Sequence, residues 1–175
     1  MTVRVNTNFS TPDQYGVDFG DLFISTDGWN VAGTAANHYL SDDASTGDWE
    51  YVFDTSAGML YGGSFTVLTS DDIFGSFGTY RNGQEVQRGS GGTAYEGSNV
   101  DMSNVGYGGS ITYSILLSSL GLSGDLALGL KWGMSCANDT IEGEVRYTSV
   151  PEPSTLLLLG ASLLGFGFTA KRKSV

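Results

Sequence analysis

Alternation of apolar and polar residues recurs in short stretches along the first 150 residues. The clearest stretch is 125–134, where large apolar residues occupy every second position: Leu126, Leu128, Leu130 and Trp132. A period of two residues is that of a β-strand, because successive side chains point to opposite faces of a sheet. We therefore expect a strand here, with the face that carries these four side chains buried.

Other stretches rich in β-branched and aromatic residues predict further strands, bounded by Gly, Asp, Asn and Ser. They are 2–9, 19–25, 49–54, 63–68, 85–88, 110–117 and 142–150, with weaker candidates at 73–77 and 79–81. Segments 49–54 and 63–68 are close enough to pair as a hairpin, and Asn82-Gly83 is a strong two-residue turn signal. Segment 88–110 is rich in Gly, Ser and Asn, so we interpret it as a long surface loop that encloses at most one short strand. One helical turn is expected at 117–122.

This succession of strands predicts an all-β fold for residues 1–149. No run of ten or more residues in this part has the periodicity of a helix. Regularly spaced strands without long helices are typical of an antiparallel β-sandwich or jelly roll. Sandwiches of this kind often bind carbohydrate, but a fold by itself assigns no function.

The chain from residue 150 to 175 has a different pattern. Pro151, Glu152 and Pro153 come first, an uncharged apolar run follows at 155–170, and Lys171-Arg172-Lys173 comes last. As a helix the apolar run would be about 24 Å long, short of the ~30 Å of a bilayer core, a gap that local thinning and snorkelling can bridge. We predict a short C-terminal transmembrane helix with its basic end in the cytoplasm. The alternative is a buried helix of a soluble domain, which the lack of an amphipathic period disfavours.

The order of these three blocks resembles the PEP-CTERM sorting signal of bacterial exopolysaccharide-associated proteins. The resemblance implies that Pro151, Glu152 and Pro153 are recognised by a membrane-embedded exosortase, that 155–170 is a transient anchor, and that Lys171, Arg172 and Lys173 are the membrane stop. It also implies removal of the tail and passage through the inner membrane to the cell surface or extracellular matrix. Segment 130–143 is similar to one that precedes the tail in many such proteins. Because that family carries a signal peptide, we expect one ahead of residue 1.

Charge is strongly asymmetric. Residues 1–150 hold five Lys and Arg against eighteen Asp and Glu, a net charge of −13. Such a surface disfavours nucleic acid and anionic lipid as partners, because both are repelled, and it favours solubility outside the cell. Calcium is the one ion that we consider, with oxygen ligands from Asp42-Asp43 or Asp71-Asp72. The alternative is that these acids keep loops solvated.

Residues with catalytic chemistry are sparse. His38 is the one histidine, no Gly-x-Ser-x-Gly or zinc-ligand spacing occurs, and the single cysteine, Cys136, is expected to be a small buried residue rather than a reactive thiol. We nominate no catalytic residue and no organic cofactor. Exposed aromatic residues could stack on sugars, or could instead close the ends of the sandwich; the candidates are Trp29, Tyr39, Trp49, Tyr80, Tyr95 and Tyr107.

Together these observations predict a non-enzymatic, secreted or surface-sorted protein. Its expected role is structural or adhesive in an extracellular polysaccharide or biofilm matrix, with an exosortase as its processing partner. Two alternatives stay open. One is a secreted glycan-active enzyme, since two suitably spaced carboxylates can hydrolyse a glycosidic bond. The other is a carbohydrate-binding module that stays anchored permanently.

Overall fold

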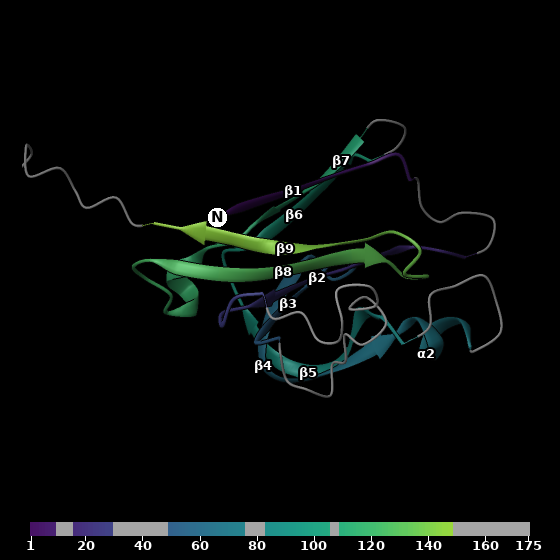
Figure 1. The fold of residues 1–175 in the computed structure, drawn as a ribbon, viewed down its shortest axis with the longest axis horizontal. Helices are drawn as coiled ribbons and strands as arrows, with labels where there is room; N and C mark the ends of the chain where they lie inside the picture. The colour runs from purple at the N-terminus through teal and green to yellow at the C-terminus, as the bar shows by residue number, and fades with distance from the viewer. Residues whose placement is uncertain (10–15, 30–48, 76–82, 106–108, 149–175) are drawn as a thin grey trace, which may run out of the picture.

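The computed structural model describes residues 1–9, 16–29, 49–75, 83–105 and 109–148. Within these ranges the strands form two antiparallel sheets (Figure 1). The smaller sheet has the order β1-β7-β6, with bounds Thr2–Thr7, Gly109–Ser114 and Asn99–Asn104. The larger has the order β5-β4-β3-β2-β8-β9, with bounds Glu85–Tyr95, Met59–Thr69, Tyr51–Asp54, Phe19–Ser25, Leu126–Met134 and Thr140–Tyr147. The predicted antiparallel all-β fold is confirmed.

The two sheets pack against each other through one apolar core. The smaller sheet contributes Val5, Ile111 and Tyr113, and the larger contributes buried residues of β2, β3, β4 and β8: Leu22, Ile24, Phe53, Leu60 and Trp132. This face-to-face packing is that of a β-sandwich. Because β2 to β5 follow one another across the larger sheet as a meander, the described strands do not have the paired Greek keys of a jelly roll.

A second buried layer lies on the opposite face of the larger sheet. Phe23 and Val52 alternate with core residues of β2 and β3, yet both are fully buried, and Lys131 of β8 is 1 % exposed. The first half of β5 lies against β2: the Arg88 amide donates to Asp21 Oδ2 over 2.7 Å. Register shifts between Gly62 and Thr69 bend the β4–β5 hairpin and allow this contact. The sequence predicted one buried face for β8, whereas the structure buries Lys131 on the other face too.

Most predicted strands are present, with ends that differ by a few residues. β3 and β4 form a hairpin as expected, but its ladder joins 51–54 to 59–62, and residues 65–68 of the predicted partner pair with β5 instead. A 3₁₀ turn, η2, occupies Leu117–Leu120 as predicted. Cys136 is buried and not in a disulfide, as expected. The candidate strand at 79–81 lies outside the described residues, as does Asn82 of the predicted turn.

Two sequence interpretations are wrong. Residues 73 and 74 of the candidate strand at 73–77 instead end a short helix, α2, Ser70–Phe74, because Thr69 and Asp72 form a capping box at its N-terminus. Residues 76 and 77 lie outside the described ranges. Segment 88–110 is not one long loop: β5 continues to Tyr95, β6 follows at Asn99–Asn104, and β7 begins at Gly109. These Gly- and Ser-rich strands have weak intrinsic propensity, and pairing with β4 and β7 supplies their backbone hydrogen bonds.

Residues 149–175 lie outside the described part of the chain, and with them the predicted helix at 155–170. Among the residues that the structure describes, no helix is both long and apolar enough to cross a membrane.

Candidate binding groove

A groove of about 630 Å³ runs along β3, β4 and the end of β5. Four half-buried aromatic rings line it, together with polar atoms of Glu50 and Ser64. The rings belong to Trp49, Tyr51, Phe65 and Tyr95. Half-exposed rings that share a groove with a few polar groups are the usual lining of a small-molecule or glycan site.

Tyr51 and Tyr95 form the centre of the aromatic wall. Their ring centroids are 5.8 Å apart, with an edge-to-face angle of 71°. Gly62 lies opposite Tyr51 in the β3–β4 ladder, and its lack of a side chain leaves room for both rings. Burial raises the pKa of the Tyr51 phenol, with added contributions from Tyr95 and Glu50, so this hydroxyl stays protonated well into the alkaline range.

Trp49 and Glu50 line the groove, and contacts with residues outside it fix both side chains. The Trp49 indole packs 5.8 Å from the Phe23 ring, and its Nε1–H donates to the Glu85 carboxylate. Glu50 Oε2 accepts hydrogen bonds from Thr26, from the amide at 2.6 Å and from the hydroxyl at 3.2 Å. Trp49 is therefore anchored to the buried Phe23 and Glu85, and Glu50 to the half-buried Thr26.

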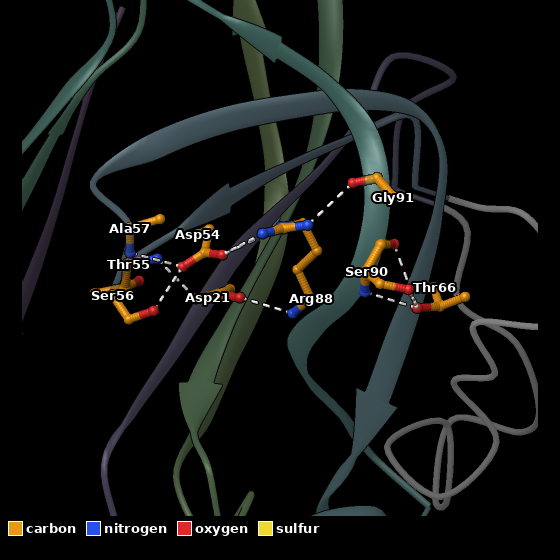
Figure 2. Close-up of polar contacts among 9 residues, drawn as sticks. All are labelled: Asp21, Asp54, Thr55, Ser56, Ala57, Thr66, Arg88, Ser90 and Gly91. Carbon is orange, nitrogen blue, oxygen red and sulfur yellow. Dashed lines mark hydrogen bonds and ion pairs between the residues drawn. The ribbon is translucent and has the colours of Figure 1, made fainter.

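A cluster of polar contacts joins β5 to β4 and to the end of β3 (Figure 2). The Arg88 guanidinium donates to Asp54 Oδ2 from Nε at 3.1 Å and from Nη2 at 2.8 Å, and from Nη1 to the Gly91 carbonyl at 3.0 Å. Its Cζ lies 3.7 Å from the centroid of the Tyr61 ring. Across the bulge, the Ser90 amide donates to Thr66 Oγ1 at 2.8 Å, next to the groove residue Phe65.

The pKa values of the two carboxyl groups in this cluster, Asp54 and Asp21, are shifted in opposite directions. Burial would raise the pKa of Asp54, but hydrogen bonds from Ala57, Ser56 and Arg88 outweigh it and hold that pKa below its ordinary value. Asp21 is more deeply buried, and burial raises its pKa to about 7 although the amides of Arg88 and Thr55 donate to it. Both acids thus bind the protein itself, in structural roles.

Sequence analysis singled out Trp49 and Tyr95, and the structure brings them into one groove. Trp29, another candidate, is 36 % exposed and does not line it. Sequence analysis did not nominate Tyr51 and Phe65. Alternation along β3 and β4 shows which face of each strand a residue lies on, but it does not show whether the opposing sheet covers that residue. Tyr39, Tyr80, Tyr107 and His38 lie outside the described residues.

Of the two acidic pairs considered as calcium ligands, the structure describes Asp71 and Asp72 only. Asp71 Oδ2 accepts the Gly83 amide at 3.1 Å, and Asp72 caps α2, so both carboxylates have structural partners. Asp42 and Asp43 are not in the described ranges. Within those ranges, no group of three or more His, Cys, Asp and Glu side chains is arranged to hold a metal ion.

Comparison with protein families identifies the tail. The model of the PEP-CTERM protein-sorting motif matches residues 149–173, which confirms the resemblance drawn from the Pro-Glu-Pro, apolar and basic blocks. The chain therefore carries the sorting signal of an exosortase substrate, a protein that passes by way of the membrane to the surface or the exterior. Residues 151–153 and 171–173 lie outside the described structure, so their individual roles stay predictions. No curated protein and no solved structure matched the chain.

Proposed function

We propose that the β-sandwich is a glycan-binding, adhesive component of an extracellular polysaccharide or biofilm matrix. The observation that carries the proposal is the aromatic groove of Trp49, Tyr51, Phe65 and Tyr95 in a chain that ends in a sorting signal. Flat rings offer apolar faces to the C–H faces of sugars, while Glu50, Ser64 and the tyrosine hydroxyls offer hydrogen bonds to sugar hydroxyls. A volume of about 630 Å³ lies in the range of small-ligand sites.

In this proposal the protein binds glycan without hydrolysing it. Hydrolysis needs two carboxyl groups that face the scissile bond. Asp21 and Asp54 instead receive hydrogen bonds from Thr55, Arg88 and Ala57. Among the described residues, Glu50 is the carboxylate that lines the groove. This arrangement supports a binding role over the alternative of a glycan-active enzyme.

Delivery would follow the order of blocks in the tail. An exosortase would recognise Pro151, Glu152 and Pro153 while 155–170 holds the chain in the inner membrane and Lys171 to Lys173 stop its passage. Cleavage near the motif would then release the sandwich to the surface or matrix. Intact mass of the protein from the envelope and from the medium tests this step. A C-terminus lost near Pro151 is expected, whereas full-length chain confined to the membrane fraction would contradict processing and leave a permanent anchor.

Binding is tested with the full chain purified in detergent and the exopolysaccharide of its native host, by affinity electrophoresis or an array of glycans. We expect Phe65→Ala and Tyr95→Ala to weaken binding by about fivefold or more, because each removes a stacking surface worth about 1 kcal/mol or more. Tyr147→Ala is the matched control, because Tyr147 is 46 % exposed and lies outside the groove. Equal binding by all four chains would overturn the proposal, and so would absence of binding by the wild-type chain.

A further inference from the structure

Lys131 lies buried between two glutamates that come from different strands. Its Nζ is 3.5 Å from Glu85 Oε2 of β5 and 3.7 Å from Glu142 Oε1 of β9. The side chains of Lys131 and Glu85 are each 1 % exposed, and that of Glu142 is 9 % exposed. Because β5 and β8 are not neighbours in the larger sheet, the Lys131–Glu85 contact joins strands that share no hydrogen-bonded ladder.

The neighbours of this contact in the adjacent strands of the sheet are apolar. Phe23 is the cross-strand neighbour of Lys131 in the β2–β8 ladder, and Val52 is that of Phe23 in the β2–β3 ladder; both are fully buried. Trp49 packs on Phe23 and donates its Nε1–H to Glu85 Oε2. An ion pair in such a place is seldom more stabilising than an apolar pair of the same volume. Stability alone therefore gives no reason for an amine and a carboxyl group at this position.

We propose that Lys131 and Glu85 form an intramolecular amide bond, with Glu142 as the proton carrier. A proton first passes from the Lys131 ammonium to the Glu85 carboxylate and comes to lie on Oε1, which becomes the leaving hydroxyl, while negative charge later develops on Oε2. The neutral amine then attacks Glu85 Cδ and the Nζ–Cδ bond forms. Glu142 takes a second proton from Nζ and delivers it to the departing hydroxyl. The Cδ–O bond breaks, and the oxygen leaves as one molecule of water.

The residues around the pair fit each requirement of this reaction. Held within 3.5 Å, the amine and carboxyl group reach the effective concentrations that fixed geometry provides, which offsets the unfavourable condensation in water. The Trp49 Nε1–H donates to the carboxyl oxygen on which negative charge develops, and a donor so placed stabilises the tetrahedral intermediate. No oxidant, metal or activated donor is consumed.

The product would be a covalent tie between β5 and β8 across the larger sheet. The chain holds a single cysteine, Cys136, so an intramolecular disulfide is not available to it. An amide tie would serve the same purpose, would resist reduction outside the cell, and would hold the curled β4–β5 hairpin against β2.

Mass spectrometry of the full chain tests the proposal directly. We expect the intact mass to be lower than the sequence mass by one water molecule, and a digest to yield a branched peptide that joins Lys131 to Glu85. Lys131→Arg should abolish the loss, and Glu142→Gln should slow it by about 10²-fold or more. Lys171→Arg and Glu144→Gln are the matched controls and should retain it, because Lys171 lies in the sorting tail and Glu144 belongs to an exposed pair with Arg146.

The same variants also distinguish the Lys131–Glu85 amide bond from other modifications that remove one water molecule. An aspartyl succinimide at Asp27-Gly28 would lower the mass equally, but it would persist in Lys131→Arg and yield no branched peptide. A wild-type chain of full sequence mass would overturn the proposal whether or not any variant folds. A loss of water that survives Lys131→Arg would overturn it as well.

Discussion

Gly62 lies directly opposite Tyr51 in the β3–β4 ladder, at a position where a side chain has no room. A Cβ on Gly62 would lie 2.5 Å from Tyr51 Cδ1 and 2.9 Å from Tyr95 Cε2. Both tyrosine rings of the groove thus pack directly against the β4 backbone at Gly62.

Gly62→Ala is therefore expected to displace Tyr51 and Tyr95 and to deform the groove. We predict a loss of about 1–3 kcal/mol in the free energy of unfolding, measured in urea, because the added methyl overpacks this site. Gly143→Ala is the control: no atom lies within 4 Å of its added Cβ, so a change within about 0.5 kcal/mol is expected. If both variants lose the same stability, the steric account of Gly62 is wrong.

Arg88→Ala should be among the most damaging substitutions in the described part of the chain. Asp54 is 7 % exposed, and removal of Arg88 takes away both guanidinium donors to Asp54 Oδ2 and the cation over Tyr61. Breaking a buried pair from one side costs about 3–5 kcal/mol, and the partial exposure of Arg88 places our expectation at the lower end.

Arg146→Ala is the matched control for that measurement. Its pair with Glu144 has the same 2.8 Å separation, but the Arg146 side chain is 79 % exposed. Solvent-exposed pairs contribute about 0–1 kcal/mol. Similar losses for Arg88→Ala and Arg146→Ala in chemical denaturation would contradict the buried role of Asp54.

Asp21 should make stability fall as the pH rises towards neutrality. Its pKa is raised from 3.8 to about 7, so between these values the folded chain holds a proton that the unfolded chain has released. The free energy of unfolding then decreases with pH by up to about 1.4 kcal/mol per unit in this window, and by nothing below it.

Asp21→Asn separates this effect from others. Unfolding free energies between pH 4.5 and 7.5 should lose the downward slope that Asp21 contributes in the wild type. Asp54 acts in the opposite sense, because its pKa is lowered: its contribution is present above its ordinary pKa and is lost as the pH falls below it. A slope unchanged by Asp21→Asn would show that Asp21 does not hold the proton.

Tyr113→Phe tests the polar contact inside the sandwich core. The Tyr113 hydroxyl accepts the Trp132 Nε1–H at 2.9 Å and lies 3.0 Å from Thr55 Oγ1, and burial raises its pKa. Its loss leaves the buried indole N–H without an acceptor, so a destabilisation of about 1–3 kcal/mol is expected in thermal or urea unfolding. Trp132→Phe removes the donor but also core volume, so the double variant should lose less stability than the sum of the two single losses. Strictly additive losses would argue against the bond.

The strands and the tail could be predicted because their signals are local. The alternation that ends at Trp132 marks β8 whatever lies around it, and Pro151 to Lys173 form three consecutive blocks that can be recognised without a fold. Segment 88–110 could not be predicted in this way, because its Gly- and Ser-rich strands depend on partners in β4 and β7. The local pattern also predicted a strand that includes residues 73 and 74, whereas the capping box of Thr69 and Asp72 stabilises a helix there.

The sequence by itself thus determined the all-β class, most strand positions and the sorting signal of the chain. The tertiary structure decided which side chains meet: the groove of Trp49, Tyr51, Phe65 and Tyr95, and the burial of Lys131 against Glu85. A period of two residues divides a strand into two faces but carries no information about what covers each face. That depends on the bend of the β4–β5 hairpin and on the extent of the opposing sheet, which arise from contacts between residues far apart in the chain.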